Sequence, residues 1–85
     1  MSTQPEFVIP LWTLADRLRK AREHAGLDQV TLAKEIDISR ATVSNYERGL
    51  VEPRKIAVRA WALRTGVPFS WLMYGTDGPN PDPLD

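Results

Sequence analysis

The sequence contains no cysteine and only one histidine, His24, among its 85 residues. Without cysteine the chain has no disulfides, no thiolate metal ligands and no thiol nucleophile. A single histidine cannot form the multi-histidine cluster that is typical of transition-metal sites. We therefore expect no metal centre and no cofactor, and we assign His24, near the end of a predicted helix, to offsetting the helix dipole.

Long hydrophobic runs are also missing, so no segment is expected to span a membrane. The first residues, MSTQPEF, lack the basic region and apolar stretch of a secretion signal. No pair of catalytic carboxylates, nucleophile–base set or phosphate-cradling glycine loop is apparent, so we do not expect an enzyme or a small-molecule site. These absences predict one small, soluble domain in the cytoplasm, with no membrane partner.

Neither sign of charge is in excess, because 11 basic residues balance 11 acidic ones. This balance counts against nucleic-acid binding, for which a basic domain is the usual footprint. The charges are nevertheless segregated. Residues 13–27 carry four basic and two acidic side chains, and residues 39–66 carry six basic and two acidic ones. The excess acid lies mainly in residues 28–38 and 76–85, so the pattern is compatible with a basic face on one side of the domain.

Capping residues, glycines and apolar spacing predict an all-α domain of five short helices over residues 13–75. Residues 1–12 contain two prolines and an alternating apolar set, Phe7, Ile9 and Leu11. This pattern predicts an extended arm. Residues 76–85 are rich in proline and aspartate and predict a disordered tail. The expected helices cover residues 13–25, 28–36, 39–49, 53–65 and 68–75, with Pro53 in the first turn of the fourth.

The third of these helices, SRATVSNYERG, is unusually polar. Its large apolar residues are Val43 and Tyr46, which are three apart and share one face. A helix-turn-helix needs such a helix, anchored by a few apolar residues and otherwise free to expose polar side chains in the DNA major groove. It also needs a residue that tolerates left-handed backbone in the turn. Asp37 occupies that place at some cost, since glycine is the residue that adopts this conformation freely.

Two stretches, LRKAREHAGLDQVTLAKEIDISRATVSNYERG (18–49) and TGVPFSWLMYG (65–75), resemble the phage-repressor and Cro type of helix-turn-helix, the lambda-repressor-like domains. The resemblance implies a compact five-helix domain and a DNA-binding transcriptional regulator from a bacteriophage or prophage, acting in a bacterial host cell. The sequence departs from this family at Lys55 and Arg59, which stand where the family usually has apolar residues.

The resemblance also implies roles for particular residues. It places Arg22 and Glu47 together as a buried ion pair that fixes the third helix against the first. The residues expected at base edges are Arg40, Ala41, Ser44 and Asn45. The residues expected at the DNA backbone are Gln29, Ser39, Thr42, Arg48 and Arg54.

One reading helix covers few base pairs, so a palindromic double-stranded operator bound by a homodimer is expected. The dimer surface is left open between the arm, the last helix, and a second apolar stripe of the fourth helix, namely Ile56, Ala60 and Leu63. For that stripe, burial in the core and simple exposure are equally open.

Two other interpretations remain. The chain could be an antitoxin or accessory protein-interaction module, whose acidic tail or apolar arm captures a partner while the helix-turn-helix body is auxiliary. It could also be a plain helical bundle with solvated charges. For single residues we expect ordinary roles: Arg19, Lys20, Arg59 and Arg64 as solvated charges, and Trp12, Trp61 and Trp71 as core.

Overall fold

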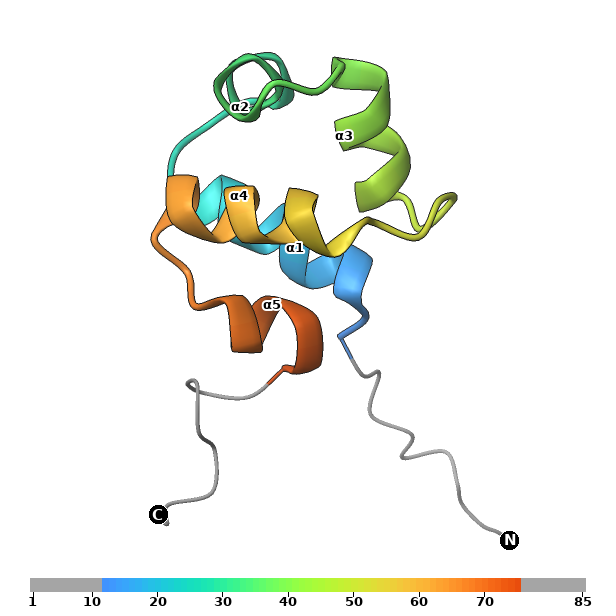
Figure 1. The fold of residues 1–85 in the computed structure, drawn as a ribbon, viewed down its shortest axis with the longest axis vertical. Coiled ribbons are helices and arrows are strands. Elements are labelled where there is room, and N and C mark those ends of the chain that lie inside the picture. Colours follow the sequence, from blue (N-terminus) through green and yellow to red (C-terminus); the bar gives the residue numbers. More distant parts are fainter. Residues whose placement is uncertain (1–11, 76–85) are drawn as a thin grey trace, which may run out of the picture.

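The computed structural model describes residues 12–75, which contain five helices and no strand (Figure 1). The all-α prediction is therefore confirmed for this part of the chain. The predicted arm, apart from Trp12, and the predicted tail lie outside the described residues. The helices are α1 (Leu14–His24), α2 (Gln29–Ile36), α3 (Arg40–Glu47), α4 (Lys55–Thr65) and α5 (Phe69–Tyr74).

The first three helices begin at polar capping residues. The side chains of Thr13, Asp28 and Ser39 each accept a hydrogen bond from the backbone N–H three residues later. At α1 the arrangement is reciprocal, because Asp16 also accepts a hydrogen bond from the backbone N–H of Thr13 at 3.0 Å. Such caps stabilise a helix by about 1 kcal/mol each. Local sequence thus fixes where these helices start.

The connection from α3 to α4 differs from the prediction. Helix α3 ends at Glu47 and not at Gly49, because Arg48 serves as its C-cap and Gly49 turns the chain with a φ of 73°. Pro53 lies before α4 and not within its first turn. Arg54 is the N-cap of α4 and has an extended backbone, which is the conformation that an N-cap requires. The loop therefore contains two more residues at each end than expected.

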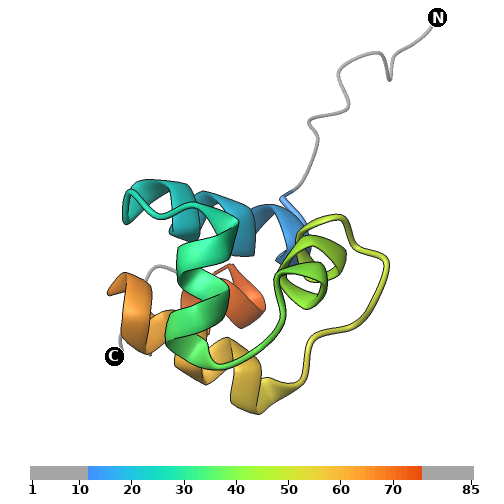
Figure 2. The same ribbon diagram turned by 90° about the horizontal axis from the view of Figure 1, so that it is seen from above.

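Helices α1 and α4 lie in the middle of the molecule, with α2 and α3 on one side and α5 on the other (Figure 1). Seen from that side, α2 and α3 lie next to each other over the central pair (Figure 2). The buried apolar core draws on all five helices. Its members are Leu18, Ala21, Leu32, Ala33, Val43, Tyr46, Val58, Trp61 and Leu72.

The three tryptophans have different environments. Trp61 is fully buried, as predicted, and its indole N–H donates to the carbonyl of Leu18 at 3.0 Å, which satisfies the polar atom inside the core. Trp71 is half-buried and meets Trp12 edge-to-face with ring centroids 6.3 Å apart. The prediction that Trp12 is core is wrong, because the side chain lies at the start of the described chain and is 51% exposed.

The structure of helix α4 shows whether its second apolar stripe is buried and where the unusual Lys55 and Arg59 lie. Val58 and Trp61 face the core, while Ile56 and Leu63 of the second stripe are 75% and 87% exposed. That stripe is therefore not core. Lys55 and Arg59 are also exposed, so their departure from the family pattern leaves no charge in the core.

Candidate nucleic-acid interface

The turn between α2 and α3 is built around Asp37. Its φ of 64° and ψ of 45° are left-handed, and it is the one non-glycine residue with positive φ between residues 12 and 75. Next to it, the N–H of Ile38 donates to the carbonyl of Ala33 at 3.0 Å, closing the end of α2. Ala33 is buried where α2 meets α3. The left-handed turn thus occupies the place predicted for it at Asp37, with a small buried residue before it and an apolar residue after it.

Helix α3 is held by one face and open on the others. Val43, Tyr46 and Glu47 are buried, and the Tyr46 ring lies 6.4 Å from that of Trp61. At the start of the helix, Arg40 and Ala41 are exposed. Ser44 and Asn45, one turn further on, are half-buried. The helix therefore presents a polar surface whose position is fixed from behind.

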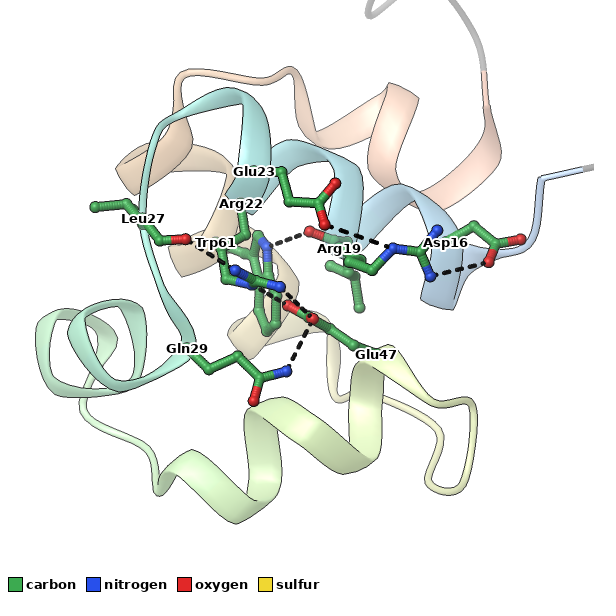
Figure 3. Close-up of polar contacts among 9 residues, drawn as sticks. Asp16, Arg19, Arg22, Glu23, Leu27, Gln29, Glu47 and Trp61 are labelled. Atoms are coloured by element: carbon green, nitrogen blue, oxygen red, sulfur yellow. Dashed lines mark hydrogen bonds and ion pairs between the residues drawn. The ribbon is translucent and has the colours of Figure 1, made fainter.

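Glu47 is the one charged residue buried among residues 12–75, and it pairs with Arg22 (Figure 3). Arg22 donates through Nε to Oε2 of Glu47 at 2.7 Å and through Nη2 to Oε1 at 3.0 Å. The two side chains are only 13% and 3% exposed. The third nitrogen of the guanidinium, Nη1, donates to the carbonyl of Leu27 at 2.8 Å. The hydrogen bonds to Glu47 hold the pKa of Arg22 above its ordinary value.

Gln29, at the start of α2, joins this pair. Its Nε2 donates to Oε1 of Glu47 at 3.1 Å, so one carboxylate connects α1, α2 and α3 (Figure 3). The sequence predicts only a phosphate contact for Gln29, and this internal bond was missed. The residues are 18 positions apart on different helices, so no periodicity could have signalled the contact. The amide keeps a second N–H, which remains available for another acceptor.

A shallow surface hollow lies next to this network, between the start of α2 and the start of α3. It is lined by Arg22, Asp28, Gln29, Val30 and Arg40. The guanidinium of Arg40 and the positive end of the α2 dipole meet here, while the guanidinium of Arg22 is already paired with Glu47 and the carboxylate of Asp28 caps α2.

The other residues expected at the DNA backbone lie around the ends of α3. The Ser39 hydroxyl accepts from the N–H of Thr42 at 3.0 Å and lies 2.8 Å from its hydroxyl, so both side chains take part in the cap. Arg48 is the C-cap of α3 and Arg54 the N-cap of α4. Both arginines are exposed, and they flank the loop after α3.

The sequence did not predict the tertiary contacts of Arg17 and Arg64. Arg17 donates to the carbonyls of Leu72 at 2.8 Å and Met73 at 3.1 Å, which caps the end of α5 and ties it to α1. Arg64 is exposed, as expected of a solvated charge, and it also forms an ion pair with Glu35 of α2. Both contacts join residues far apart in the chain, and neither lies on α3.

The described part of the chain contains neither a metal-ligand cluster nor a membrane-spanning helix. Between residues 12 and 75, no three His, Asp or Glu side chains gather in a way that could hold a metal ion. None of the helices there is long and apolar enough to cross a membrane.

Comparison with known proteins gives consistent matches. The curated HTH-type transcriptional regulator DicA of Escherichia coli (strain K12) is 31% identical over 71 residues, which is 84% of this chain and 53% of DicA. The chain thus spans about half the length of that relative. Among solved structures, the P22 c2 repressor protein in complex with synthetic operator 9T superposes with a TM-score of 0.71. It covers 76% of this chain and 98% of its own, at 23% identity, so this likeness concerns the fold.

The family model described as "Helix-turn-helix" matches residues 18–72. The match begins inside α1, ends inside α5 and includes the turn at Asp37. Together with the capped turn and the polar, rigidly backed α3, it shows that this chain belongs to the helix-turn-helix family.

Proposed function

We propose that the protein is a sequence-specific transcriptional regulator that binds double-stranded DNA by placing α3 in the major groove. One observation carries this proposal: α3 is fixed from behind by Val43, Tyr46 and the Glu47 ion pair, while its remaining surface is polar and open. This is the construction of a recognition helix. The similarity to the transcriptional regulator DicA and to the operator-bound P22 c2 repressor supports it.

The base-reading set is Arg40, Ala41, Ser44 and Asn45. Arg40 is exposed at the start of α3, where it can donate two hydrogen bonds to O6 and N7 of a guanine. Ala41 is exposed beside it and can contact the methyl group of a thymine. Ser44 and Asn45 lie one turn further along, where they reach neighbouring base edges.

The backbone-contacting set is Gln29, Ser39, Thr42, Arg48 and Arg54. Gln29 and Ser39 lie at the starts of α2 and α3, where the helix dipole and N–H groups attract phosphate. The bond from Gln29 to Glu47 holds the amide in place, with its second N–H directed at the DNA. The Arg22–Glu47 pair fixes the orientation of α3 against α1 and therefore sets the angle at which Arg40 meets the bases.

Two copies of the chain bind a palindromic operator as a homodimer, because one recognition helix contacts too few base pairs for tight specific binding. The two half-sites are then separated by about one helical turn of DNA. The regulator is of the repressor or Cro type found in bacteriophages and prophages.

The decisive experiment first selects bound duplexes from a random pool and then compares Arg40→Ala with the wild type on the selected and a scrambled duplex. Loss of the guanine contact should lower the preference for the selected duplex by about 1–3 kcal/mol. Arg19→Ala, at an exposed arginine of α1, serves as the control and should leave the preference unchanged. An equal fall on both duplexes would show that Arg40 touches only phosphate.

A second measurement separates phosphate contacts from base contacts. Arg48→Ala and Arg54→Ala should each weaken binding to all duplexes and reduce the log–log salt dependence by about one unit. If neither slope changes, both residues lie outside the interface.

A further inference from the structure

The outer face of α4 carries an apolar surface that the core does not use. Ile56 and Leu63 are two turns apart and highly exposed, at 75% and 87%, and half-buried Ala60 lies between them. Leu63 also forms one wall of a groove between the end of α4 and the start of α5. That groove is lined by Arg59, Ala62, Leu63, Gly66, Val67, Pro68 and Phe69.

The rim of this surface is basic. Helix α4 contains no acidic residue, and its cations are Lys55, Arg59 and Arg64. Arg64 already pairs with Glu35 of α2. Arg59 lies over the ring of Phe69, 4.4 Å from its centroid, which keeps the guanidinium beside the groove without neutralising it. Arg54 provides no side-chain hydrogen bond to the start of α4, so the positive end of the helix dipole is also unopposed there.

This charge pattern argues against a second copy of α4 as the occupant. Two α4 helices packed antiparallel about a two-fold axis would place Arg59 near its own symmetry mate. Like charges across an interface are destabilising, so the surface is not complementary to itself.

We propose that the face formed by Ile56, Ala60, Leu63 and the adjoining groove is a docking site for an acidic amphipathic helix of another protein. Apolar residues of the partner, spaced to match the exposed stripe, would cover Ile56 and Leu63. Carboxylates flanking them would meet Lys55 and Arg59. The residues expected to read bases all lie on α3, whereas Arg54, which is proposed to contact the DNA backbone, lies next to Lys55 at the edge of this face.

The test uses the full chain and two synthetic helical peptides with the same leucine spacing, one flanked by glutamates and one by lysines. Fluorescence anisotropy should show at least tenfold tighter binding of the glutamate peptide, weakened by added salt. Leu63→Ser should reduce that affinity at least fivefold. Arg59→Gln should reduce the preference for glutamate over lysine. Leu50→Ser is the matched control, since Leu50 is 60% exposed in the loop after α3, away from this face, and should change nothing.

Folding is checked by melting curves, which should be unaltered in Leu63→Ser because the side chain makes few core contacts. Equal binding of the two peptides, or binding of neither, overturns the proposal. Concentration-dependent dimerisation in sedimentation that Leu63→Ser abolishes would overturn it in favour of a second copy. Tighter peptide binding after changing Asp77, Asp82 and Asp85 to Asn would overturn it in favour of the chain's own residues 76–85.

Discussion

Between residues 12 and 75, two Arg–Glu ion pairs join different helices, and they differ mainly in their surroundings. Arg22 and Glu47 connect α1 to α3, with side chains 13% and 3% exposed. Arg64 and Glu35 connect α4 to α2, with side chains 39% and 41% exposed. The chemistry of the partners is the same in both. Only the first pair is shielded from water.

The difference in burial changes what each pair does. Glu47 is held by Arg22 and Gln29, while Arg22 also donates to the carbonyl of Leu27, so removal of one partner leaves the other charge stranded. At the surface, water replaces a lost partner at little cost. The buried pair therefore fixes α3 against the rest of the fold, whereas the exposed pair adds little rigidity.

The largest expected effect comes from breaking the buried pair. Glu47→Gln should destabilise the fold by about 3–5 kcal/mol, because it leaves the Arg22 charge without its carboxylate in a poorly hydrated site. In a domain of this size that lowers Tm by roughly 12 °C or more. Glu35→Gln, which breaks the exposed pair, should cost at most about 1 kcal/mol. Glu52→Gln, at an exposed glutamate, should cost less still. Similar melting temperatures for the three variants would show that Glu47 is effectively solvated.

A smaller effect is expected when the charge is kept but the shape of the cation is changed. Arg22→Lys cannot hold both oxygens of Glu47 and the Leu27 carbonyl at once, and should cost about 1–3 kcal/mol in urea unfolding. The same change at Arg64 should stay within about 0.5 kcal/mol. Equal costs at the two positions would mean that the contribution of the buried pair to stability depends on charge and not on the shape of the guanidinium.

A change at Gln29 tests whether the hydrogen bond from Gln29 adds to the stability given by the Arg22–Glu47 pair. Gln29→Met keeps the length of the side chain but removes its hydrogen bond to Glu47, whose Oε1 still accepts from Arg22. We expect a loss of about 1 kcal/mol in urea unfolding. Duplex binding should weaken in addition, because the phosphate donor is gone. Val30→Ala, at the exposed neighbour, should leave stability unchanged. A stability loss without any change in duplex affinity would remove Gln29 from the DNA interface.

The smallest effect concerns an exposed carboxylate that contacts backbone instead of a cation. The hydrogen bond from the backbone N–H of Thr31 holds the pKa of Asp28 below its ordinary value of 3.8. The stabilisation is therefore complete above that ordinary value and is lost as the pH falls through the lower folded value. Asp28→Ala should lower Tm at pH 7, and the difference from wild type should shrink as Asp28 is protonated in acid. A difference that stays constant to the lowest pH would show that the carboxylate charge is not involved.

The comparison of the two pairs also shows how far sequence reasoning reaches. The buried pair was expected only because the sequence resembles a known family, since 25 residues separate Arg22 from Glu47. The exposed pair and the Arg17 cap on α5 were missed for the same reason: neither contact leaves a local pattern. The end of α3 was also misplaced, because the turn at Gly49 and the extended Arg54 depend on how the loop crosses to α4.

The sequence by itself determined the number and type of helices, the starts of the first three at Thr13, Asp28 and Ser39, and the polar character of α3, since these depend on residues within one or two turns of each other. Tertiary structure alone decided which charges are buried and which apolar residues are left outside. Glu47 and Glu52 differ only in where the packed helices place them. Leu63 and Trp61 lie two residues apart on α4, yet one is 87% exposed and the other fully buried, because burial depends on which face of α4 packs against α1.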